Sequence, residues 1–190
     1  MVYSTIMRIV DKKNYASNKD NTNCFEPMFG QDISGHRMPA YYRLKDDEIR
    51  RILQEAETIG IPTEYLRFND PDARGTSYNP FDDIIDIKGN IFPDKNSPHP
   101  RDVMSVKAVL AHEFYGHRPY KEQYLEEFER GLSKETWNDE FRASYRAALD
   151  SPGLSDGERR SLILDAIERA SEAQIAIKYN NIMRQMVYGY

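Results

Sequence analysis

The sequence predicts an α+β fold that is mostly α, with a few short strands in the N-terminal half and a helical C-terminal half. Apolar residues recur at helical spacing through most of residues 101–177, whereas alternating stretches of strand type occur between residues 61 and 92. The chain has 190 residues, 39% of them hydrophobic and 30% charged, which is typical of one domain that buries its own core.

Residues 1–45 are predicted to form an irregular arm that packs on the body, and residues 46–190 a single domain. Asn, Asp, Lys and Ser dominate residues 12–23, and three residues near the end of the arm are expected to pack on the body: Tyr41, Tyr42 and Leu44. The first predicted helix covers residues 46–59. Its apolar residues follow helical spacing, and Gly60 and Pro62 end it.

The strands are predicted between this helix and residue 92. Residues 61–69 read as a short strand and residues 71–80 as a turn region. The stretch FDDIIDIKGNIF, residues 81–92, alternates like a strand, turns at Gly89-Asn90 and continues as a further short extended piece. Residues 94–100 are rich in proline and are predicted to form a loop.

Four helices are predicted to follow, over residues 102–117, 119–130, 134–150 and from 156 to about 177. Ser133 stands in N-cap position for the third of them. Ser155 and Glu158 have the spacing of a capping box ahead of the fourth, whose apolar residues run from Leu162 to Ile177.

The amino-acid composition excludes several classes of protein and several kinds of binding partner. The net charge of -5 gives no basic surface of the kind that binds nucleic acid. The single cysteine, Cys24, excludes an intrachain disulfide and a cysteine-rich zinc knuckle. The sequence contains neither a signal-peptide pattern nor an apolar run long enough to span a membrane. It therefore predicts a cytoplasmic protein without nucleic-acid or membrane partners.

The segment AVLAHEFYGHRPY, residues 108–120, is the most informative part of the chain. It contains two of the four histidines, with a glutamate directly after the first, in the pattern H-E-x-x-x-H: His112, Glu113 and His117. The zinc-peptidase pattern H-E-x-x-H places both imidazoles on one helix face, and this segment has one residue more. Five residues of ideal α-helix turn by about 500°, which leaves the two histidines roughly 140° apart.

A single wide turn of π type at about residues 113–117 would return both imidazoles to one side, and such turns are frequent at functional sites. Gly116, which lacks a Cβ atom, eases this distortion. The string HEFYGH resembles the metal-binding helix of the dipeptidyl peptidase III enzymes, and with it the zincin superfamily of zinc peptidases. The resemblance implies a zincin-like domain that holds one Zn²⁺ per chain on His112 and His117, with Glu113 as general base.

A catalytic zinc needs three protein ligands and one open position, and with no further cysteine or nearby histidine a carboxylate is expected to complete the set. Glu140 lies 23 residues after His117, early on its predicted helix, and the small residues Ala143 and Ser144 follow one turn later. This arrangement resembles the second helix of glutamate-type zincins, so we expect Glu140 to be the third ligand. Asp139 and Glu172 are the alternatives, and Asp139 also suits a partner of a ligand histidine.

The sequence thus predicts a zinc metallopeptidase that hydrolyses a peptide or protein substrate. Glu113 would take a proton from zinc-bound water and deliver it to the leaving amine. The donor that stabilises the oxyanion is open among four residues: Tyr145, Tyr115, Tyr120 and His99. An edge strand is expected to align the substrate, either residues 76–78 or residues 83–88.

Two other functions fit the same residues. The first is a non-catalytic module that zinc stabilises, such as a phage or mobile-element accessory protein, in which a fourth protein ligand such as His99 would close the site. The second is a peptidase effector or toxin directed at one partner protein, for which the compact domain and its arm are suited.

Overall fold

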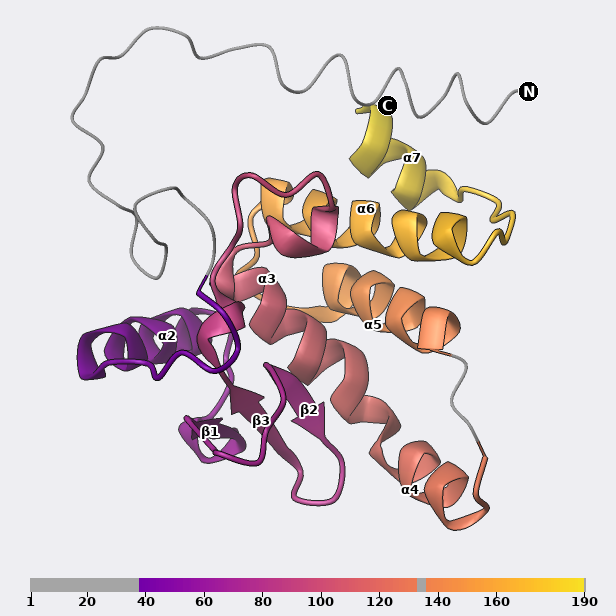
Figure 1. The fold of residues 1–190 in the computed structure, drawn as a ribbon. Helices are drawn as coiled ribbons and strands as arrows, with labels where there is room; N and C mark the ends of the chain where they lie inside the picture. Colours follow the sequence, from indigo (N-terminus) through magenta and orange to yellow (C-terminus); the bar gives the residue numbers. More distant parts are fainter. Residues whose placement is uncertain (1–37, 133–135, 190) are drawn as a thin grey trace, which may run out of the picture.

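The computed structural model describes residues 38–132 and 136–189, which form a mostly helical body around a small three-stranded sheet (Figure 1). The predicted α+β class, mostly α, is confirmed. Leu44 is buried in the core and Tyr42 packs against it, as predicted, whereas Tyr41 is 88% exposed, contrary to prediction. The rest of the predicted arm, residues 1–37, lies outside the described residues.

The first helix, α2 (Asp46–Thr58), confirms the predicted helix. The Glu48 carboxylate accepts a hydrogen bond from the Lys45 backbone N–H at 2.8 Å, which satisfies a donor at the start of the helix. Ile52 and Ala56 are fully buried on the inner face. Gly60 adopts a φ of 71°, a left-handed conformation that ends helices at little cost only for glycine.

The sheet has the strand order β1-β3-β2, with β1 (Leu66–Phe68), β2 (Ser77–Asn79) and β3 (Ile84–Ile87). β3 is central; β1 pairs with it in parallel and β2 antiparallel, with Tyr78 opposite Ile85. β2 therefore forms one edge of the sheet. Of the two predicted edge segments, residues 76–78 overlap this edge strand, whereas residues 83–88 contain the central strand.

Three details of the predicted strands are wrong. Residues 61–69 form a strand only at β1, because a 3₁₀ turn, η1 (Thr63–Tyr65), follows Pro62. The predicted turn region 71–80 contains β2, whose three residues are too few to show alternation in the sequence. The extended piece expected after Gly89 is another 3₁₀ turn, η2 (Gly89–Ile91).

The helix expected from residue 102 begins four residues later. Residues Pro100–Asp102 form a separate 3₁₀ turn, η3, and α3 (Val106–Ala111) starts after Ser105, whose hydroxyl accepts a hydrogen bond from the Ala108 N–H at 3.1 Å. The chain continues through the π-helix η4 (His112–His117), the 3₁₀ turn η5 (Arg118–Tyr120) and α4 (Lys121–Glu129).

The last helices are α5 (Thr136–Asp150), α6 (Asp156–Glu172) and α7 (Asn181–Tyr188). The predicted capping box of α6 is confirmed, because Ser155 and Glu158 exchange side-chain to backbone hydrogen bonds. α6 stops before Ile177, and the sequence reading missed α7, which starts after the N-cap Asn180. The predicted N-cap Ser133 lies outside the described residues.

α3 and η4 cross the middle of the molecule, with the sheet on one side and α5 and α6 on the other (Figure 1). The fully buried side chains come from all of these layers, among them Ile85, Leu110 and Leu162. η4 thus lies between the edge strand β2 and α5, which positions the residues of the site. No helix among the described residues has the length and apolar character that crossing a membrane requires.

Candidate metal centre

The H-E-x-x-x-H segment forms the π-helix that its spacing predicts. Residues His112–His117 all lie in η4, and the wider turn brings both imidazoles to the same side. The Nε2 atoms of His112 and His117 are 3.0 Å apart, and the ring centroids 4.7 Å apart. Both residues are buried, at 6% exposure each.

Gly116 is required by the packing of η4 against α5. A Cβ atom at this position would lie 2.5 Å from the carbonyl oxygen of Ala143 and 2.8 Å from its Cα. Any side chain would therefore push the two helices apart. The small residues expected to allow a close approach, Ala143 and Ser144, lie at this crossing and are almost fully buried.

The close crossing brings Glu140 to the two imidazoles. Its Oε2 lies 3.2 Å from Nε2 of His112, and its Oε1 lies 3.7 Å from Nε2 of His117. Donors bound to tetrahedral zinc at about 2.0–2.1 Å are roughly 3.3–3.4 Å from one another. The three separations scatter around that value, so the donor types and their spacing suit a zinc ion with three protein ligands.

A hydrogen-bond chain fixes the tautomer of His112. Its Nδ1 lies 2.8 Å from the hydroxyl of Ser144, and that hydroxyl donates its hydrogen to Asp165 on α6 at 2.5 Å. Because the Ser144 hydrogen is used for Asp165, Nδ1 of His112 must donate. The ring thus presents Nε2 toward the cluster, the arrangement that partners of metal-binding histidines impose.

The same logic holds for His117 through different partners. Its Nδ1 lies 3.0 Å from the hydroxyl of Tyr124 and 3.3 Å from Oδ2 of Asp139, and the Tyr124 hydroxyl donates to Asp139 in a short hydrogen bond. Asp139 therefore contacts the outer nitrogen of His117, whereas Glu140 faces the inner one. Of the two adjacent acids, the geometry favours Glu140 as ligand and Asp139 as partner of His117.

The charged groups of the cluster shift the pKa values of Glu140 and His112 in opposite directions. Burial alone would raise the pKa of Glu140, but the hydrogen bond from His112 and the charges of His112, His117 and Arg169 outweigh it and lower that pKa to about 2. Burial opposes protonation of His112, yet Glu140, Glu113 and Asp165 together raise its pKa above the usual 6.5. Both shifts arise from the opposite charges that these residues bring together at the cluster.

Glu113 is oriented by the edge strand. Its Oε2 accepts the backbone N–H of Tyr78 on β2 at 2.8 Å, and the residue is 7% exposed. His112, Glu113 and His117 each offer one donor atom within 4.8 Å of the others. The carboxylate thus lies beside the cluster and is held by the sheet.

The cluster opens into a cavity of about 580 Å³. It is lined by the edge strand and its following turn, by η2, η3 and the nearby Met104, by the end of α3 with η4, and by α4 with the nearby Leu132. Two charged residues from α5 and α6, Glu140 and Arg169, complete the lining. A buried donor cluster in the wall of such a cavity can reach a ligand, which a fully closed structural site cannot.

The candidate oxyanion donors do not gather at this cavity. The Tyr145 hydroxyl accepts a hydrogen bond from Asn180 at 2.6 Å, and Tyr145 is not among the residues that line the cavity. Tyr115 donates to the Ile59 carbonyl at 2.5 Å, and the Tyr120 ring packs under Arg142. The structure therefore does not bring Tyr145 to Glu113, the other residue predicted to act in catalysis.

His99 and Glu172 belong to a different cluster. Nδ1 of His99 lies 3.2 Å from Glu168, and Glu172 forms an ion pair with Arg101. Glu172 is thus not a ligand of the centre at His112. Oxygen and nitrogen donors of His99, Glu168 and Glu172 also lie close enough to share an ion, but the guanidinium of Arg101 already contacts both acids there.

The sequence reading missed two charged residues of the centre, Asp165 and Arg169. Asp165 is fully buried and bonds Ser144, and Arg169 contacts both Asp165 and Glu140 at 3.2 Å. In the sequence, Asp165 and Arg169 have the i, i+4 spacing that lets two helix residues pair, and Asp165 lies among the apolar residues of α6. A charge on the buried face of a helix is a usable signal, since such charges are almost always paired.

Comparison of the chain with protein-family models, curated proteins and solved structures finds no match. The functional argument therefore depends on the geometry of the centre itself.

Proposed function

We propose that the protein is a zinc-dependent hydrolase of the metallopeptidase type, with a zincin-like site in which His112, His117 and Glu140 hold one Zn²⁺. The observation that carries the proposal is the convergence of two Nε2 atoms and a carboxylate at zinc spacing, with both outer nitrogens tied to hydrogen-bond acceptors. Two imidazole lone pairs facing each other at 3.0 Å repel unless a cation lies between them.

Glu113 is the residue suited to move the proton. When bound, zinc supplies Lewis-acid polarisation of the scissile carbonyl and lowers the pKa of water. The Glu113 carboxylate accepts a proton from the attacking water and delivers it to the leaving amine. The Tyr78 N–H that holds Oε2 keeps the carboxylate beside the donor cluster and orients it.

The edge strand is suited to align a peptide. Tyr78 directs its N–H away from β3 toward Glu113, and in a strand the carbonyl of the same residue points to the same side. An extended substrate can donate a backbone N–H to that carbonyl and add a strand to the sheet next to Glu113. This supports a peptide as the substrate class.

Arg169 is the best-placed donor for the developing oxyanion. The residue lines the cavity, and its guanidinium lies 3.2 Å from Oε2 of Glu140. A guanidinium in the cavity wall could donate hydrogen bonds to a negatively charged oxygen that forms beside the cluster. Arg169 thus replaces Tyr145, the residue predicted from the sequence, as the donor to the oxyanion.

Metal analysis and three variants test the proposal. Purified protein is expected to bind about one zinc ion per chain. His117→Ala should abolish binding, while the control His99→Ala, outside the centre, should retain it. Glu113→Gln should keep the metal and lose peptide hydrolysis by a factor of about 10²–10⁴, the usual contribution of a general base.

Protein that binds no zinc would end the proposal. Stoichiometric zinc with no hydrolysis of any peptide pool would favour the non-catalytic zinc module. Undiminished hydrolysis by Glu113→Gln would remove Glu113 from its role.

A further inference from the structure

Three large apolar side chains lie exposed together at one end of the cavity. Phe81, in the turn after β2, is 58% exposed, and Phe128 on α4 is 67% exposed. Their rings meet edge to face with centroids 4.9 Å apart, and Leu132, 51% exposed, lines the same cavity. We name these three residues the aromatic platform. Exposed apolar groups gathered in one place mark a binding surface more often than scattered ones do.

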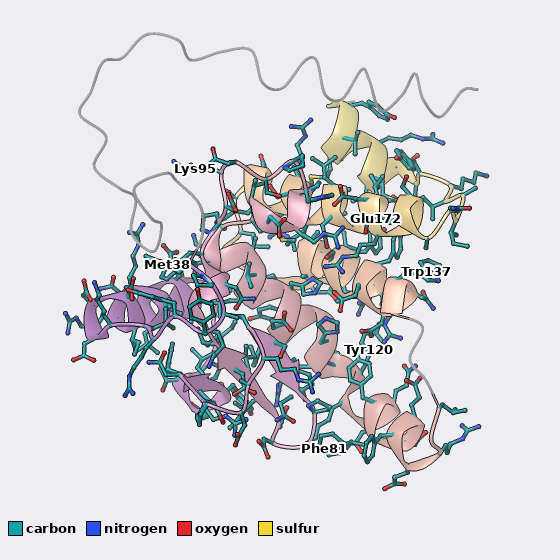
Figure 2. The ribbon with its side chains drawn as sticks, in the orientation of Figure 1. Met38, Phe81, Lys95, Tyr120, Trp137 and Glu172 are labelled. Atoms are coloured by element: carbon teal, nitrogen blue, oxygen red, sulfur yellow. The ribbon has the colours of Figure 1, made fainter. Side chains whose placement is uncertain are left out.

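The opposite end of the cavity is polar. There the lining consists of Asn90 from η2, Arg101 and Asp102 from η3, and Arg169 from α6, together with Met104, which is only 4% exposed. Figure 2 shows the separation: Phe81 lies at the bottom, by α4, while Glu172, the ion-pair partner of Arg101, lies near the top on α6. The donor cluster with Glu113 opens between the two ends. A peptide across the cluster would therefore meet an apolar surface on one side only.

The distance along the strand sets which side chains can reach the platform. Tyr78 contacts Glu113 through its backbone, and Phe81 follows three residues later. Three residues span at most about 10 Å, and the chain turns after Asn79, so the platform lies within roughly three substrate positions of the cleaved bond. The two Phe rings meet at 83°, which leaves apolar ring surface for a further aromatic or branched side chain.

We propose that the aromatic platform makes the protein selective for peptides with a large apolar side chain, aromatic above all, on one side of the cleaved bond. This inference rests on the proposed peptidase function and names its substrate class. The platform is continuous with the reactive cavity, and a bulky side chain would cover surface that otherwise faces water. The polar opposite end gives no such selectivity.

Cleavage of a matched peptide series by the zinc-loaded full-length protein tests the inference. Each peptide carries Phe, Leu or Ala at one of the three positions on either side of the bond. We expect kcat/KM to be about tenfold higher for Phe than for Ala at one position, on one side only. Phe128→Ala and the double variant F81A/F128A should bring that ratio toward one. Ile175→Ala, which removes an exposed apolar side chain outside the cavity, should leave it unchanged.

A binding measurement separates this inference from the proposed function. Zinc-loaded Glu113→Gln is titrated with the Phe and Ala peptides by calorimetry, and the Phe peptide should bind about tenfold more tightly, a difference that Phe128→Ala removes. Cleavage without any apolar preference, or with a preference that survives in F81A/F128A, would overturn the inference and leave the peptidase standing. A concentration-dependent dimer that Phe128→Ala dissociates would also overturn it, because a second copy would then cover the platform.

Discussion

Replacing Gly116 with alanine should damage the candidate metal centre through packing, without changing a proposed ligand. The new Cβ would lie 2.5 Å from the Ala143 carbonyl oxygen, where an ordinary C···O contact needs about 3.3 Å. The obstacle is the backbone of α5, which cannot rotate away as a side chain would. η4 and α5 must therefore separate by roughly 0.8 Å.

This separation has two measurable costs. Overpacking of this kind destabilises by about 1–3 kcal/mol, partly offset by the roughly 1 kcal/mol that alanine gains over glycine in a helix. A net loss of up to about 2 kcal/mol lowers the melting temperature by up to roughly 8 °C in a chain of this size. Glu140 lies one turn before Ala143 and moves with it, while zinc ligands tolerate deviations of only about 0.2 Å. Zinc affinity should therefore fall at least about tenfold.

Thermal unfolding with and without zinc, together with competition against a chromophoric chelator, measures both effects. Gly157→Ala is the matched control, because a Cβ there would meet only the Ser155 hydroxyl, at 4.0 Å. That variant should keep its zinc affinity and unfold at the same or a slightly higher temperature. If Gly116→Ala behaves like the control, the close crossing of η4 and α5 does not hold the centre together.

Two further predictions concern the partners of His112. Ser144→Ala should lower zinc affinity by about 10–100-fold, measured by the same competition, because Nδ1 of His112 and the buried Asp165 lose their shared partner; unchanged affinity would refute that role. In zinc-free protein, the raised pKa of His112 adds stability that is present below pH 6.5 and is lost as the pH rises through the raised pKa. The pKa of Glu140 is lowered from 4.5 to about 2, and it adds stability that is present above pH 4.5 and is lost as the pH falls toward 2. The difference in melting temperature between the native sequence and Glu140→Gln should thus be largest between pH 4.5 and 6.5, and a difference independent of pH would contradict the charge pairing.

Local features were open to prediction because local spacing produces them. The five-residue separation of His112 and His117 demanded a widened turn, and η4 is that turn. The capping box at Ser155 and the ending of α2 at Gly60 follow from single residues and their neighbours. The three-residue strand β2 was missed, because its pairing with β3 and its contact with Glu113, not its own sequence, make it a strand.

The α+β class, the π-turn and the types of donor residue could thus be predicted from the chain, since these depend on residues within a turn or two of each other. The tertiary structure decided between neighbours: Glu140 and Asp139 are adjacent in one helix, and only the crossing of α5 over η4 directs them to different nitrogens of His117. It also placed Arg169 rather than Tyr145 at the cavity, because the contact of α6 with the centre joins residues far apart along the chain. The spacing of residues along one helix decides which side chains share a face, whereas the packing between helices decides which of those side chains contact each other.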